Sequence, residues 1–108
     1  MTVSIEEFKR LELRVGVVEA AERVKGSARL LRLRVDFGDV KRQVLTGLAH
    51  LYPPEHFLGR SLVFITNLEP RKIRGEVSEA MLLTAVESDE RVVPIVPESV
   101  VRPGTPIY

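Results

Sequence analysis

The sequence contains no cysteine among its 108 residues. This absence excludes a disulfide framework, an iron–sulfur cluster and any zinc site built on thiolates. The two histidines, His50 and His56, lie six positions apart and are too few to form a metal site by themselves. We therefore expect neither a metal nor another cofactor. No nucleophile–base pair or paired-carboxylate motif stands out, so the sequence favours a binding protein over an enzyme.

Long apolar runs and aromatic side chains are also scarce. No run approaches the roughly 18–20 apolar residues that span a membrane, and the first ten residues are charged where a signal peptide would be apolar. We therefore expect a cytoplasmic protein with no membrane partner. Aromatic residues make up 6% of the chain, and Phe37 and Phe64 lie at apolar strand positions. Few rings are left to stack on nucleic-acid bases.

The formal net charge is only +1, but the charges are segregated along the chain. Residues 23–42 sum to +5 and residues 71–74 to +3, whereas residues 75–98 sum to −5. If the fold brings the two basic segments together, they form one basic patch for a polyanion; otherwise they are solvated loops and strand edges. Arginine outnumbers lysine by 12 to 4, and its planar guanidinium suits bidentate phosphate contacts.

The hydrophobic pattern predicts a small, mainly β protein. Ser4 and Glu7 form a capping box for a short helix over residues 5–10. Gly16 indicates a bulge or bend in the first strand. Proline in the first turn and Gly59 beyond the end predict a second short helix over residues 53–59. Alternation and turn signals predict the strands and a long polar loop, which are 11–17, 31–37, 41–46, 61–66 and 80–86 for the strands and 67–78 for the loop.

Five strands with a helix between the third and fourth follow the order of an all-β OB-fold barrel. We assign the barrel to residues 11–86 of a single domain, 1–108. The remaining C-terminal extension, 87–108, is apolar but interrupted by four prolines, which limit long strand pairing. It either covers its own barrel or packs against a second copy. We favour the second arrangement, a homodimer, because two-fold homodimers are the commonest soluble oligomers.

Four segments carry a family resemblance. They are Leu13-Arg14-Val15-Gly16, the stretch 30–38, Arg42-Gln43-Val44-Leu45-Thr46-Gly47, and 67–83 with its Asn67-Leu68-x-Pro70, Gly75, Ser78 and Met81. In this order and spacing they resemble the tRNA-binding domain family. That family includes the C-terminal extension of methionyl-tRNA synthetases, structure-specific tRNA-binding proteins and endothelial monocyte-activating polypeptide-like cofactors. The chain departs from the family pattern at four places, with Val24-Lys25 for His-Pro, Arg29 for lysine, Thr46 for serine and Ala80 for glycine.

The residues expected to bind tRNA come from the basic segments and from the resemblance. The outer faces of the second and third strands and the long loop supply Arg32, Arg34, Arg42, Arg71, Lys72 and Arg74. The resemblance adds Arg29, Thr46, Asn67, Ser78 and Met81. Three of these fit a structural role equally well: Asn67 could hold a turn, Ser78 could cap loop backbone, and Met81 could belong to the core.

The resemblance implies a non-catalytic protein that recognises folded tRNA by shape and phosphate contacts, with no DNA partner. Such a protein acts free-standing or as a partner subunit of methionyl-tRNA synthetase in aminoacylation. One branch of the family resembles the CsaA-like export chaperones, which implies peptide binding through a dimer groove as the alternative. Asn67-Leu68 and Met81 favour the tRNA-binding branch.

Overall fold

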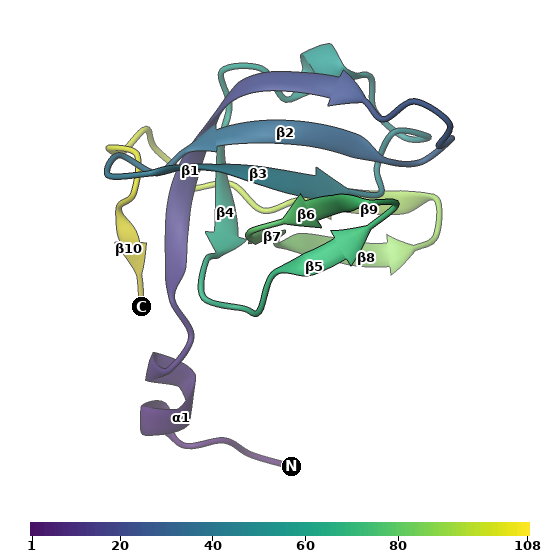
Figure 1. The fold of residues 1–108 in the computed structure, drawn as a ribbon. Coiled ribbons are helices and arrows are strands. Elements are labelled where there is room, and N and C mark those ends of the chain that lie inside the picture. The colour runs from purple at the N-terminus through teal and green to yellow at the C-terminus, as the bar shows by residue number, and fades with distance from the viewer.

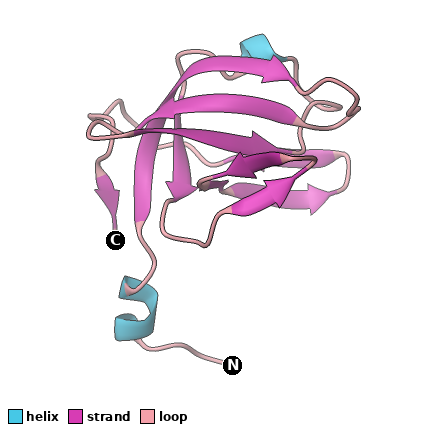
Figure 2. Ribbon diagram, in the orientation of Figure 1, coloured by secondary structure: helices cyan, strands magenta, loops and turns pink.

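The computed structural model describes residues 1–108, and β-strands dominate it (Figures 1 and 2). The helices are α1 (Ile5–Lys9) and the 3₁₀ turn η1 (Pro54–His56). The strands are β1 (Leu13–Arg23), β2 (Leu31–Asp36), β3 (Lys41–Thr46), β4 (Ser61–Ile65), β5 (Arg71–Ile73), β6 (Glu76–Ser78), β7 (Met81–Leu82), β8 (Thr84–Ser88), β9 (Arg91–Pro94) and β10 (Pro106–Ile107). The predicted capping box is confirmed, since Ser4 and Glu7 exchange both backbone-to-side-chain bonds.

The main sheet has the antiparallel order β3-β2-β1-β4-β7. The long strand β1 pairs with β4 over residues 13–17 and with β2 over residues 17–23, so it belongs to both sides of the barrel. Two hydrogen bonds join β3 to the segment before β7 and so bridge the open edge of the barrel. The Glu79 amide donates to the Gln43 carbonyl at 2.9 Å, and the Leu45 amide donates to the Ser78 hydroxyl at 3.0 Å. The result is a nearly closed five-stranded barrel, and the predicted mainly-β OB fold is confirmed.

The barrel interior is filled by alternate residues of β2 and its neighbours. Leu31, Leu33 and Val35 are completely buried, as their alternation with charged residues predicted. Phe37 and Phe64 meet edge to face with ring centroids 5.3 Å apart. Both rings are therefore committed to the core and unavailable for stacking on bases, which confirms the sequence-based expectation.

Of the bulge or bend predicted at Gly16, the bulge is absent from that position. The register shift in β1 lies between Val18 and Ala20. A Cβ at position 16 would collide with the side chains of Val35 and Phe37. Glycine is needed there because β2 packs directly across that point of β1, and the sequence pattern does not report contacts between distant strands.

The sequence predicts a loop over residues 67–78, but residues 71–78 form the β5–β6 hairpin. The fifth strand, predicted over 80–86, is divided into β7 and β8. The break is at Leu83, whose amide donates to the Val63 carbonyl at 2.9 Å and whose carbonyl accepts from the Ile95 amide at 3.1 Å. The helix predicted over 53–59 is only the single turn η1. The first strand extends beyond the predicted end at residue 17, because the charged second half of β1, up to Arg23, pairs with β2.

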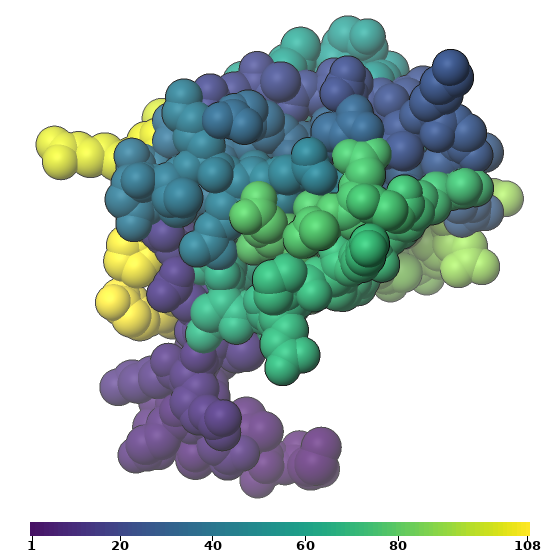
Figure 3. Space-filling view, in the orientation of Figure 1, coloured from purple at the N-terminus to yellow at the C-terminus, as the bar shows by residue number.

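Much of the C-terminal extension packs on its own barrel. Strand β9 pairs with β8, and β10 lies beside the start of β1, where Ile107 faces Leu13. The Tyr52 hydroxyl also donates to the Val92 carbonyl at 2.6 Å. By contrast, α1 projects from one end of the barrel and buries none of its residues (Figure 3). Neither helix is long enough to cross a bilayer.

Candidate functional site

The β5–β6 hairpin presents three basic side chains to solvent. Its two-residue turn, Arg74-Gly75, has φ values of 50° and 79°, and two positive values are characteristic of a type I′ hairpin turn. Arg71, Lys72 and Arg74 are exposed, and none of them forms an ion pair. The predicted loop cations are thus free to bind an anion, and they are carried on an ordered hairpin.

The base of this hairpin is anchored to β3. The buried Ser78 hydroxyl accepts a hydrogen bond from the Leu45 amide and donates one to the Ala80 carbonyl at 2.9 Å. The Gln43 side-chain amide donates to the Val77 carbonyl at 3.0 Å. Ser78 therefore caps backbone groups, which is the structural role left open by the sequence. These contacts hold the hairpin alongside β3, as Figure 1 shows.

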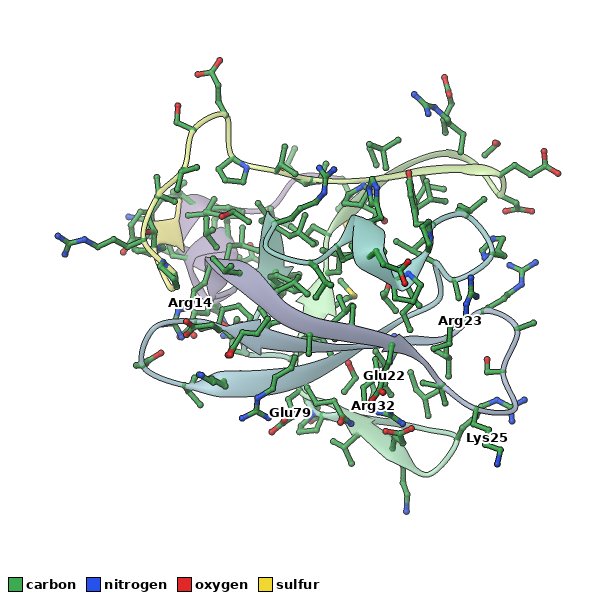
Figure 4. The ribbon with its side chains drawn as sticks, turned by 90° about the horizontal axis from the view of Figure 1, so that it is seen from above. Arg14, Glu22, Arg23, Lys25, Arg32 and Glu79 are labelled. Carbon is green, nitrogen blue, oxygen red and sulfur yellow. The ribbon has the colours of Figure 1, made fainter.

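Arg32 and Arg34 lie on β2 but have different surroundings. Arg34 is exposed, has no ion pair and faces Gln43 across the β2–β3 ladder. Arg32 is half-buried and is paired with two carboxylates, Glu22 on β1 and Glu76 on the hairpin. Figure 4 shows Arg32 next to Glu22. The paired guanidinium keeps the pKa of Glu76 below its usual range, and the hydrogen bonds that Arg32 donates to both carboxylates raise the pKa of Arg32.

The end of β1 and the turn that follows it carry further cations, of which Arg29 was predicted from the sequence and Arg23 and Lys25 were not. Arg23 donates to the Ala49 carbonyl at 3.1 Å, and Arg29 lies 3.5 Å from the His50 imidazole. Lys25 has no ion-pair partner, and Figure 4 shows it at the same end of the barrel as Arg23. OB folds commonly bind ligands with three parts of the barrel: this first turn, the face of the second and third barrel strands, and the loop before the fifth barrel strand. That rule, applied to the basic residues around this turn, would have identified Arg23 and Lys25.

Two other predicted site residues are used by the fold itself. The Arg42 guanidinium donates to the backbone carbonyls of Thr66 and Glu79, across the seam between β3 and β7, which close the barrel. The Asn67 side chain accepts from the Glu12 amide at 2.7 Å and donates to the Arg10 carbonyl at 2.6 Å. Asn67 thus fastens the segment between α1 and β1, a contact 55 residues away in sequence.

A shallow hollow lies at the base of the hairpin. Its lining consists of Leu45, Leu68, Glu69, Arg71, Ser78, Ala80 and Met81. Met81 is partly exposed here and is not a core residue, whereas the neighbouring Ala80 is buried. Thr46, at the end of β3, is half-buried and does not line the hollow. The hollow combines apolar side chains with one unpaired arginine, Arg71.

The chain is similar in sequence to known proteins. The family described as "Putative tRNA binding domain" matches residues 13–106. Methionine–tRNA ligase of Archaeoglobus fulgidus is 44% identical over 103 residues, which are 95% of this chain and 16% of that protein. The ligase of Methanothrix thermoacetophila is 53% identical over 83 residues, 77% of this chain and 12% of the ligase. The chain thus spans only a small fraction of the length of these curated relatives.

Solved structures extend the match over the whole chain. A MetRS-related protein from Pyrococcus horikoshii superposes with a TM-score of 0.95 at 34% identity, covering 100% of this chain and 99% of that one. The chaperone CsaA from Bacillus anthracis superposes with a TM-score of 0.91 at 30% identity, covering 100% of both chains. With a family match from β1 to β10 and a barrel of the same shape, the chain belongs to the tRNA-binding domain family.

Proposed function

We propose that this chain is a non-catalytic tRNA-binding module that grips folded tRNA through phosphate contacts. The observation that carries the proposal is the hairpin with Arg71, Lys72 and Arg74, which are unpaired and are held alongside β3, the strand that pairs with β2 and its exposed Arg34. The β1–β2 turn extends this basic surface with Lys25 and its neighbours. Because the buried phenylalanines leave few rings for base stacking, shape and backbone charge are the features of RNA that this surface can recognise.

We further propose that the module works in the cytoplasm with methionyl-tRNA synthetase, as a partner subunit or as part of a longer chain. Support comes from the similarity to methionine–tRNA ligases and to the MetRS-related protein. A weak tRNA binder attached to a synthetase raises the effective concentration of tRNA at the enzyme without any catalytic group of its own.

The proposed function is tested by comparing folded tRNA with an unfolded RNA of equal length at two salt concentrations. We expect tighter binding of the folded tRNA. The logarithm of its affinity should fall by about 0.7–0.9 for each phosphate contacted per log unit of salt. Equal affinity for both RNAs would contradict recognition by shape.

Peptide binding is the second candidate function, favoured by the similarity to the chaperone CsaA and by the apolar side chains in the hollow at Leu45, Leu68 and Met81. Binding in an apolar hollow involves little counterion release. An affinity for an unfolded peptide that hardly changes with salt, together with weak tRNA binding, would therefore support the chaperone function instead.

We also propose a homodimer, formed at the end of the barrel from which α1 projects. Helices of five residues are unstable alone, yet α1 buries none of its residues in its own chain. Ile5 is 60% exposed and Leu11 is 42% exposed. The chain ends at the same place, where Tyr108 is 90% exposed and Ile107 pairs with Leu13. A second copy would cover these apolar side chains and stabilise the helix.

A further inference from the structure

The β5–β6 hairpin is a sheet of its own and does not join the barrel ladder along its length. Its base is fixed by Ser78, which is buried. Toward the turn, the attachment depends on the side chains of Arg32 and Gln43, which reach Glu76 and Val77. Arg74 is the first residue of this turn, and Lys72 faces Val77 across the hairpin. The position of these cations therefore depends on contacts near Glu76.

The contact between Arg32 and Glu76 is bidentate. The Arg32 Nε donates to Glu76 Oε1 at 2.6 Å, and Nη2 donates to Oε2. A two-point contact between planar groups fixes orientation as well as distance. The third nitrogen, Nη1, donates to Glu22 Oε1 at 2.5 Å. Both carboxylates bind one guanidinium, but only Glu76 belongs to the hairpin.

We propose that Glu76 is a positioning residue for RNA binding: its bidentate contact with Arg32 holds the outer part of the hairpin, and therefore Lys72 and Arg74, in register with the barrel surface. The proposal rests on the proposed function and deepens it. Arg32 acts as the anchor of the basic hairpin in this arrangement, in place of the direct phosphate contact that its position in the sequence predicts.

Simple charge counting and positioning predict opposite effects for loss of this carboxylate. A carboxylate on a phosphate-binding face repels RNA, so removing it should tighten binding if charge alone matters. If Glu76 positions the hairpin, removing it leaves the basic side chains mobile, and RNA binding must then order them at a cost in entropy. The net effect is weaker binding despite the gain of one positive charge.

Glu76→Gln and Glu22→Gln form a matched pair for this test. Each removes one negative charge from the same guanidinium, and Glu22 makes no hydrogen bond to the hairpin. We expect Glu76→Gln to weaken tRNA binding about tenfold, equivalent to ~1.4 kcal/mol. We expect its salt slope to fall by about one unit. Glu22→Gln should bind tRNA as tightly as the unmodified chain, or more tightly.

Amide hydrogen exchange supplies a readout that does not depend on RNA. In Glu76→Gln, the amides of residues 71–78 should exchange faster while those of β1 and β2 keep their rates. Tight binding by Glu76→Gln, equal to that of the unmodified chain or of Glu22→Gln, would overturn the positioning role. Unchanged exchange in the hairpin would overturn it as well. If the unmodified chain shows no salt-dependent tRNA binding, the proposed function itself fails, which is a distinguishable result.

Discussion

At the scale of single residues, the backbone packs closely where the C-terminal extension crosses the β2–β3 turn. Gly104 has a φ of +87°, and its amide donates to the Val15 carbonyl at 2.7 Å. A Cβ at this position would collide with the Phe37 carbonyl oxygen. The extension can reach β1 only because residue 104 has no side chain.

Gly104→Ala should therefore destabilise the protein strongly. Gly26 is the matched control, since its φ is +83° but a Cβ there would meet nothing within 4 Å. Gly26→Ala bears only the left-handed backbone cost, about 1–2 kcal/mol, whereas Gly104→Ala adds a backbone collision of about 1–3 kcal/mol. Urea unfolding measures both free energies. Equal losses would contradict the close packing at Gly104.

Residues of one type also differ in what they can bind. Arg34 and Lys25 have no ion-pair partners, whereas Arg32 is occupied by two carboxylates and Arg42 by backbone carbonyls. A net-charge sum counts these side chains alike. An arginine that already has partners in the fold must give them up to bind a phosphate, so the unpaired cations are the better candidates for direct contacts.

At the scale of elements, the β5–β6 hairpin concentrates unpaired positive charge. Three of its residues are basic and exposed, and the hairpin is attached to the barrel at Ser78 and Glu76. Substitution of the exposed cations leaves both attachments in place. The contribution of the hairpin to binding can therefore be separated from its contribution to folding.

Arg71→Ala combined with Arg74→Ala should weaken tRNA binding and lower the salt slope by about one to two units, because one or two phosphate contacts are lost. Arg60→Ala combined with Arg102→Ala removes the same charge from the segments before β4 and β10 and should leave the slope nearly unchanged. Filter binding over a salt series measures both. An unchanged salt slope in the Arg71→Ala, Arg74→Ala variant would exclude the hairpin from the interface.

At the scale of the whole molecule, the two ends of the barrel differ in character. One end carries the basic turn between β1 and β2, and the other carries the projecting α1 and the C-terminus (Figure 1). A two-fold dimer through the second end would leave the basic surface of each subunit exposed. Two such surfaces could then meet one large RNA.

Sedimentation velocity tests the dimer. The unmodified chain should sediment at twice the 12.2 kDa mass of one subunit. Ile5→Glu with Leu11→Glu should sediment as a monomer, because buried unpaired carboxylates oppose association. Val86→Glu, which also replaces an exposed aliphatic residue but lies on β8, should remain dimeric. A monomeric unmodified chain would contradict the proposal.

The sequence by itself determined the barrel. Alternating residues in β2, the turn at Gly38 and the capping box at Ser4 are local signals, and each is governed by neighbours within a few positions. The family pattern in residues 67–83 likewise identified the segment that forms the basic hairpin. The β2–β3 pairing and the mainly-β class follow from such local rules.

Only the tertiary structure decided which charged side chains are free. The partners of Arg32 lie 10 and 44 positions away, and those of Asn67 are 55 and 57 positions away. The room that Gly16 leaves for Val35 and Phe37 likewise depends on distant strands. Ion pairing, burial and close approach are set by distances in space, which a linear pattern does not contain until the chain has folded.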